Sequence, residues 1–322
     1  MLQLQEYTTF IEDHLKRVEI PDTPSALYDP IRYFLKIGGK RIRPILTILG
    51  AELFGSTKER VISQALSVEV FHNFTLVHDD IMDNAPLRRS QQTIHQKWNV
   101  NSAILSGDVM LIKAYELLCA IETDKLSETL HLFNKTATEV CEGQQLDLDF
   151  ESRDDVSIDE YIEMIRLKTS VLLGGALKIG AIIANASEKD KNEIYAFGQN
   201  IGLAFQIQDD ILDLYSDPEK FGKQVGGDVI SNKKTLLHLT ALANATKEQV
   251  EVMHQLKNES DIDVKVKRTR ELYDQIGVKE ACRIRMQEHY DTAVSALDRI
   301  AVPEENKKTL LELANFLMDR DL

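Results

Sequence analysis

Apolar residues recur at steps of three and four along almost the whole chain, which is the spacing of an α-helix with a buried face. Residues 100–121 show this clearly, and the same period runs through 126–145, 158–184, 189–215 and 279–300. The alternation of period two that marks strands is almost absent. The pattern therefore predicts an all-α protein.

One stretch, 170–186, is apolar nearly all round, which is typical of a central helix surrounded by others. Only seven prolines and fifteen glycines punctuate the 322 residues, and they mark turns between helices. No low-complexity linker and no repeat at solenoid periods interrupts the pattern. We expect a single domain over residues 1–322.

Charge limits the partners of this chain. Lys and Arg total 38 against 52 for Asp and Glu, so the net charge is -14. Such an acidic protein is a poor candidate for binding nucleic acid or an anionic membrane through bulk charge. No run of about 18 apolar residues suggests a membrane span, and three sparse cysteines indicate reduced thiols in a cytoplasmic protein.

The same acidic motif, D-D-x-x-D, occurs twice, and each copy is flanked by apolar helical sequence. The two copies contain Asp79, Asp80 and Asp83, and Asp209, Asp210 and Asp213. On a helix, positions i and i+4 share a face, so each copy gathers carboxylates that repel one another. A hard cation such as Mg²⁺, bound through carboxylates and substrate phosphates, relieves that repulsion. A solvated acidic face is the alternative, and duplication argues against it.

Several basic positions accompany the acidic motifs. The run Gly38-Gly39-Lys40-Arg41-Ile42-Arg43-Pro44 places cations at a predicted helix start, where a bound anion would be stabilised. The others are Arg88, Arg89, Lys168, Lys223 and Lys233. Each alone is an ordinary surface charge. Together with two candidate magnesium motifs, they indicate a diphosphate substrate bridged to metal ions.

These segments, in this order, closely resemble the trans-isoprenyl diphosphate synthases, a family that includes farnesyl and geranylgeranyl diphosphate synthases. The resemblance rests on GGKRIRP, HDDIMDNAPLRR, KTSVLLGGA, FQIQDDILD and GKQVGGDVISNKKT. It implies the all-α isoprenoid synthase fold, a single large helical bundle around a central cavity, and a homodimer. The implied substrates are isopentenyl diphosphate and an allylic diphosphate, joined head to tail with about three Mg²⁺ ions.

The resemblance also implies roles for individual residues. Metal ions would be bound by Asp79, Asp83 and Asp209, with Asp80, Asp210 and Asp213 in support. The isopentenyl diphosphate site would comprise Lys40, Arg43, His72 and Arg89. The allylic diphosphate site would comprise Arg88, Lys168, Thr169, Gln206, Lys223 and Lys233. We expect Lys168, Thr169 and Gln206 to act in catalysis, the last two by stabilising a carbocation with dipoles.

Two histidines precede the first motif. His72 lies seven residues, or two turns, before Asp79 on the same helical face, which favours a place in the site over a core role. For His78 we favour a structural role.

Aromatic residues before the first motif predict a short product. Phe74 and Phe71 lie five and eight residues before Asp79, with the small Thr75 beside Phe74. One helical turn is about 5.4 Å, roughly the reach of one isoprene unit, so a ring one or two turns away can limit chain growth. We predict fifteen to twenty carbons, with twenty favoured. The alternative is that both rings are ordinary core.

Other functions share parts of this pattern. A class I terpene cyclase has the fold and first motif, but it needs neither a second D-D-x-x-D nor an isopentenyl site. A longer-chain polyprenyl diphosphate synthase differs only in product length. A non-catalytic partner subunit tends to lose an acidic motif, and this chain keeps both.

Overall fold

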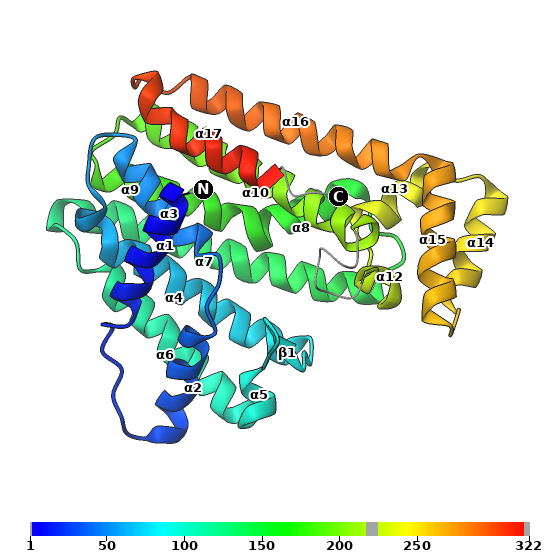
Figure 1. Cartoon of the computed structure of the whole chain (residues 1–322), viewed down its shortest axis with the longest axis horizontal. Helices are drawn as coiled ribbons and strands as arrows, with labels where there is room; N and C mark the ends of the chain where they lie inside the picture. The colour runs from blue at the N-terminus through cyan, green and yellow to red at the C-terminus, as the bar shows by residue number, and fades with distance from the viewer. Residues whose placement is uncertain (1, 217–224, 319–322) are drawn as a thin grey trace. The chain divides into compact units, whose positions relative to one another are not determined.

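The computed structural model describes residues 2–216 and 225–318. It is 79% helical, which confirms the predicted fold class (Figure 1). A hairpin of β1 (Leu87–Arg88) and β2 (Gln91–Gln92) pairs antiparallel. The chain divides into two compact units. Unit 1 comprises the described residues within 1–136, 175–195 and 301–306, and unit 2 those within 137–174, 196–300 and 307–322.

Unit 1 contains the first half of the chain. Its helices are α1 (Leu2–Leu15), α2 (Ser25–Lys36), α3 (Ile42–Glu52), α4 (Lys58–Met82), α5 (Ile94–Lys97) and α6 (Val100–Leu118). Four helices contribute residues to both units: α7 (Thr123–Ser152), α9 (Val171–Ile183), α10 (Glu188–Tyr215) and α17 (Glu304–Met318), most of which lies in unit 2.

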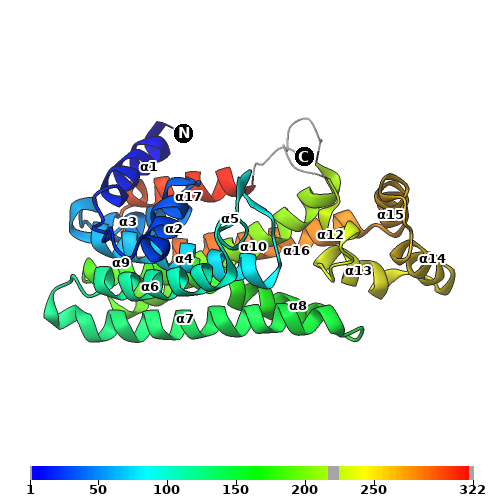
Figure 2. The same ribbon diagram turned by 90° about the horizontal axis from the view of Figure 1, so that it is seen from below.

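The centre of unit 1 is α4, which packs against α1, α3 and α6. Figures 1 and 2 both show α4 beside α6. Its buried apolar residues, such as Val61, Val68 and Phe71, face several directions, so it behaves as an enclosed helix. Enclosure holds α4 in place along its length, which fixes the direction of the polar side chains near its C-terminus.

Unit 2 contains the second motif and a separate core. Its remaining helices are α8 (Ile158–Ile165), the π-helical turn η1 (Arg166–Ser170), α12 (Gly227–Ile230), α13 (Leu236–Asn244), α14 (Lys247–Lys257), α15 (Ile262–Ile276) and α16 (Val278–Asp298). The core joins Tyr161, Ile211, Leu236 and Cys282, which come from α8, α10, α13 and α16. This apolar cluster positions α10 against α8 and α13.

Local signals begin and end several of these helices. Ser157 and Glu160 form a capping box at the start of α8, and Thr246 and Gln249 form another on α14. Gly277, with φ of 82°, separates α15 from α16. Within the described residues, no helix combines the length and apolar character needed to cross a membrane.

Candidate active site

The first acidic motif lies at the C-terminal end of α4, which ends at Met82 with Asp83 as its cap. The C-terminal end of a helix carries the negative pole of the macrodipole, so carboxylates here are unfavourable without cations. Asp79 is partly exposed, Asp83 is exposed and Asp80 is buried. The motif therefore presents its first and third carboxylates outward and turns the second inward.

Arg88 holds the buried carboxylate. Its Nε and Nη2 donate to Asp80 Oδ1 at 2.9 and 2.6 Å, and Nη2 also lies 3.3 Å from Asp79 Oδ2. Burial raises the pKa of Asp80 in spite of this cation. Asp80 Oδ2 is buried and has no hydrogen-bond partner within the described part of the chain. That oxygen suits a further cation or water.

The short hairpin brings both arginines of the Arg88-Arg89 pair to α4. Arg89 and Ser90 form its turn with φ of 51° and 63°, a left-handed conformation uncommon outside glycine. Thr93 Oγ1 donates to Ala85 O at 2.7 Å, and Tyr33 Oη donates to Gln92 O at 2.9 Å. These bonds fix the hairpin to its own base and to α2.

A basic cluster lies two turns before the motif. Arg43 Nη1 is 3.1 Å from His72 Nε2. Burial lowers the pKa of Arg43 to about 10 and lowers that of His72 well below its usual 6.5, with the neighbouring Arg43 adding to the second shift. His72 is therefore neutral, and its ring nitrogen accepts from the arginine. A half-buried cation held by a neutral partner is well suited to receive an anion.

The glycine-rich loop closes on this cluster from the other side. Gly38 and Gly39 have φ of 84° and 150°. A Cβ added to Gly39 would lie 2.6 Å from a guanidinium nitrogen of Arg89, so only glycine allows this approach. Lys40 follows on the exposed surface of the loop. The structure thus brings Lys40, Arg43, His72 and Arg89 to one side of unit 1.

The second motif ends another long helix, α10, and repeats the burial pattern. Asp209 and Asp213 are partly exposed, while Asp210 is buried. Tyr161 Oη donates to Asp210 Oδ2 at 2.5 Å, and the backbone N–H of Leu236 donates at 3.3 Å. Burial raises the pKa of Asp210 to about 7. Here the inward carboxylate is held by neutral donors.

Unit 2 contains a cavity of about 500 Å³ beside this motif. Five predicted site residues line it: Lys168, Thr169, Gln206, Asp210 and Lys233. Thr169 Oγ1 lies 3.5 Å from Gln206 Oε1, so the two predicted dipoles share one part of the wall. Met164 and Ile165 provide apolar surface. Lys223 lies outside the described residues.

Lys168 and Thr169 are carried by a π-helical turn, η1. A π-turn inserted between α-helices redirects side chains and is frequent at functional sites. On α7, a Cβ added to Gly143 would lie 2.2 Å from the backbone nitrogen of Lys168. The absence of a side chain at Gly143 therefore lets α7 approach η1 closely.

Sequence reasoning missed three residues of this cavity. Asp147 on α7 accepts from Lys168 Nζ at 2.6 Å. Asp228 lies in the first turn of α12, which begins at Gly227, and burial followed by the charge of Asp213 raises its pKa to about 6. Tyr161 anchors Asp210. The available signals were the acids Asp147 and Asp149 alternating with leucine near the end of α7, and an acid after a double glycine at 228.

The predicted length-determining residues form part of an aromatic cluster in unit 1. The Phe74 ring lies 5.7 Å from Phe71, which lies 5.1 Å from Phe133. Phe71 is buried, and Phe74 is only half-buried. Thr75 donates its hydroxyl to His72 O at 2.8 Å. His78 lies 3.2 Å from Ile104 O, in keeping with a structural role.

The carboxylates suit Mg²⁺ by their chemistry. No group of three acidic, histidine or cysteine side chains lies close enough to bind a metal ion unaided, within the ranges that the structure describes. Mg²⁺ does not require one, because it is typically held by one or two carboxylates together with substrate phosphates and water. Outward carboxylates at two helix C-termini and the orphaned Asp80 oxygen match that donor set.

Comparison with known proteins gives a consistent result. A geranylgeranyl pyrophosphate synthase of Geoglobus acetivorans is 36% identical over 313 residues, covering 97% of this chain and 95% of that protein. The geranylgeranyl diphosphate synthase of Sulfolobus acidocaldarius is 34% identical over 321 residues, with 98% and 97% covered. A crystal structure of a geranylgeranyl pyrophosphate synthase superposes with a TM-score of 0.94 at 44% identity, with 99% of each chain covered. The polyprenyl synthetase family model matches residues 24–276, and the chain belongs to the polyprenyl synthetase family.

Proposed function

We propose that the chain is a short-chain trans-prenyltransferase. It condenses isopentenyl diphosphate with dimethylallyl, geranyl or farnesyl diphosphate to give geranylgeranyl or farnesyl diphosphate. The observation that carries the proposal is the half-buried Arg43–His72 cluster two turns from an acidic motif, in addition to a second acidic motif with its own lysine-lined cavity. A terpene cyclase handles one diphosphate and has no use for two such sites.

The isopentenyl diphosphate site is assigned to unit 1. Arg43 and Arg89 offer planar forks of donors that suit diphosphate oxygens, while Lys40 adds an exposed point charge. Burial lowers the pKa of Arg43 only to about 10, so its guanidinium stays cationic near pH 7. The neutral His72 orients Arg43 without adding a second positive charge.

The allylic substrate is assigned to residues of unit 2. Lys168, Lys233 and Lys223 would bind its diphosphate and stabilise the charge that grows on it as the C–O bond breaks. Thr169 and Gln206 would turn oxygen dipoles toward the carbocation. Asp147 holds the Lys168 ammonium in place.

About three Mg²⁺ ions are assigned to Asp79, Asp83 and Asp209, with Asp80, Asp210 and Asp213 in support. When bound, Mg²⁺ neutralises the diphosphate oxygens and makes diphosphate a better leaving group. Asp80 and Asp210, turned inward onto Arg88 and Tyr161, fix the ends of their helices so that the outward carboxylates keep their direction.

The reaction balances without an added base. The allylic C–O bond breaks, and diphosphate leaves with the electron pair. The π electrons of isopentenyl diphosphate then form the new C–C bond, and the proton lost to restore the double bond passes to an oxygen of the departed diphosphate. Apolar residues such as Met164 and Ile165 exclude water that would trap the cation.

Product length is assigned to Phe74, supported by Phe71. The Phe74 ring is half-buried and packs against the buried Phe71, whose ring in turn packs against Phe133. A ring supported in this way resists displacement by a growing chain better than an isolated side chain. This arrangement favours a product of twenty carbons.

We also propose a homodimer in the cytoplasm. The helix α6 exposes Val100, Ile104, Leu105 and Ile112, and large exposed apolar side chains gathered on one helix are typical of a protein interface. A second copy of this chain is the assigned partner, and Ile112→Glu should shift the chain toward monomer in size-exclusion chromatography with light scattering. All three cysteines are free thiols, as in reduced compartments.

Product analysis tests the function. The purified chain is incubated with Mg²⁺ and each allylic primer, with and without isopentenyl diphosphate, and the products are measured by mass. We expect isopentenyl-dependent formation of twenty-carbon diphosphate. Hydrocarbon release from the primer alone would instead show a cyclase, and activity only on addition of a second protein would show a partner subunit.

A further inference from the structure

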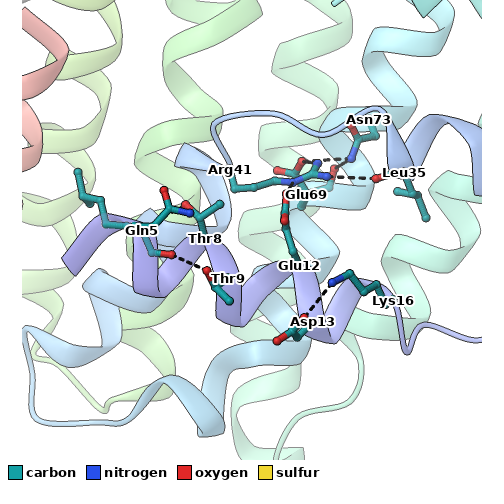
Figure 3. Close-up of polar contacts among 11 residues, drawn as sticks. Gln5, Thr8, Thr9, Glu12, Asp13, Lys16, Leu35, Arg41, Glu69 and Asn73 are labelled. Atoms are coloured by element: carbon teal, nitrogen blue, oxygen red, sulfur yellow. Dashed lines mark hydrogen bonds and ion pairs between the residues drawn. The ribbon is translucent and has the colours of Figure 1, made fainter. Parts of the chain in front are cut away.

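Arg41 is the one cation of the GGKRIRP run that the proposed reaction does not use, and it is the most buried of them. Its side chain is 2% exposed and faces Glu69, whose side chain is 3% exposed. Arg41 Nη1 donates to Glu69 Oε1 at 2.5 Å, and Nη2 donates to Leu35 O at 3.1 Å (Figure 3). One guanidinium thus joins α4 to the end of α2.

The carboxylate of Glu69 is itself held from a second side. Asn73, one turn further along α4, donates Nδ2 to Glu69 Oε1 at 3.2 Å and to Glu69 O at 2.9 Å. Figure 3 shows Arg41 and Asn73 on the same carboxylate, with Glu12 of α1 on the near side of the guanidinium. Glu12 Oε1 lies 3.9 Å from Arg41 Nε and is 40% exposed, so its contribution is the weakest.

The backbone of Arg41 is in a conformation that needs such support. Its φ of 51° is left-handed, which is uncommon for a residue with a side chain and persists only where the surroundings impose it. Arg41 is also the N-cap of α3, with no side-chain cap bond. The buried ion pair therefore fixes the point where the loop turns into the helix.

Both neighbours of this point belong to the isopentenyl site. Lys40 precedes it and Arg43 follows on the first turn of α3. His72, which contacts Arg43, lies on α4 between Glu69 and Asn73, seven residues before Asp79. The ion pair thus ties the loop that carries two substrate cations to the helix that carries their partner and the first acidic motif.

We propose that Arg41 is a positioning residue for isopentenyl diphosphate: locked onto Glu69, it sets the path of residues 38–43 along α4 and so the place of Lys40 and Arg43. The inference rests on the proposed function and extends it. Glu69, an anion beside a site for anions, then acts through geometry, because its charge alone would oppose substrate binding.

The charge of Glu69 and its positioning role would change the KM for isopentenyl diphosphate in opposite directions, which allows a test. Glu69→Gln removes a negative charge, so a purely electrostatic role would lower the KM for isopentenyl diphosphate. A positioning role would raise it. Arg41→Lys keeps the charge but loses the guanidinium fork, so an electrostatic role leaves the KM unchanged and a positioning role raises it.

We expect both variants to raise the KM for isopentenyl diphosphate roughly 10- to 100-fold. The KM for the allylic primer should stay within about twofold of the wild-type value. A change in one KM alone is diagnostic because general loss of folded protein lowers kcat instead. Combined, the two changes should raise the KM no further than either alone, because they break one interaction. Opposite signs for the two variants, or equal shifts in both KM values, would overturn the proposal.

Two controls keep the result interpretable. Lys191, another buried cation of unit 1, pairs with the more exposed Glu128 and Glu188, so Lys191→Met removes ion pairs elsewhere and should leave both KM values unchanged. If Arg41→Lys fails to fold, Asn73→Ser tests the proposal in its place. A several-fold rise in the KM for isopentenyl diphosphate supports the proposal, and an unchanged KM overturns it. A wild-type chain that consumes no isopentenyl diphosphate would refute the proposed function itself, separately from this network.

Discussion

The two acidic motifs have the same letters, the same position at a helix C-terminus and the same inward second aspartate, yet their anchors differ. In unit 1 a cation, Arg88, holds Asp80 through two nitrogens. In unit 2 a hydroxyl and a backbone N–H hold Asp210. The comparison teaches that the spacing D-D-x-x-D fixes which carboxylates face outward, whereas the surrounding elements decide how the inward one is stabilised.

The largest expected effect is loss of the outward carboxylates. Asp79→Ala and Asp209→Ala should each lower kcat on the order of a thousandfold, because each removes a negative ligand proposed for metal. Steady-state assays with saturating Mg²⁺ measure this. Asp291→Ala, an exposed acid on α16, is the matched control, and equal loss in the control or retained activity at either motif would contradict the assignment.

Loss of the residue that anchors the inward aspartate should lower the free energy of unfolding by different amounts in the two motifs. Arg88→Met leaves Asp80 buried without its cation and should lower the free energy of unfolding by about 3–5 kcal/mol. Tyr161→Phe removes one hydrogen bond to a carboxyl that keeps Leu236 N–H, and should cost about 1–2 kcal/mol. Urea unfolding followed by circular dichroism measures both, and a larger loss for Tyr161→Phe would reverse the comparison.

Close helix packing should also differ between Gly143 in unit 2 and Gly107 in unit 1. Gly143→Ala forces a Cβ against the backbone of η1 and should cost about 1–3 kcal/mol while lowering kcat, because η1 carries Lys168. In unit 1 a Cβ at Gly107 meets only the ring end of His78, which can rotate away. Gly107→Ala should therefore change both quantities less, as thermal unfolding and kcat would report.

The aromatic cluster is specific to unit 1. Phe74→Ala should move product from twenty carbons toward longer chains by about one or two isoprene units, since one turn of helix is roughly 5.4 Å. Product masses give the answer. Phe10→Ala, an aromatic change on α1, serves as control. An unchanged distribution of product lengths in Phe74→Ala would show that the ring is ordinary core packing.

The smallest expected effect concerns acid stability of unit 2. Burial, with Lys234 nearby, lowers the pKa of His238 to about 4. The folded state excludes a proton that the unfolded chain binds. The contribution of His238 to the free energy of unfolding is therefore complete above pH about 6.5, and it falls by about 3 kcal/mol at most as the pH drops toward 4. His238→Gln should flatten the stability profile between these values, whereas the exposed His254→Gln should not.

Much of the site follows from residue pattern. Helical periodicity predicted the all-α class, and the duplicated motif with its basic runs predicted a diphosphate enzyme. The same reasoning placed Arg88 with the allylic site and did not predict its bond to Asp80, because the two residues meet only when the hairpin folds back onto α4. Asp147 and Tyr161 were missed since neither belongs to a repeated motif, and their polar neighbours in the sequence give them the look of ordinary surface residues.

The sequence by itself determined the helices, the clustering of carboxylates in each motif and the positions of the basic runs, because these follow from periodicity of 3.6 and local turn chemistry. Only the tertiary structure decided which charges are buried together. Arg41 and Arg43 are two residues apart, yet one is locked onto Glu69 and the other lies against a neutral histidine. That difference arises from desolvation and from partners on another helix, neither of which is written in local spacing.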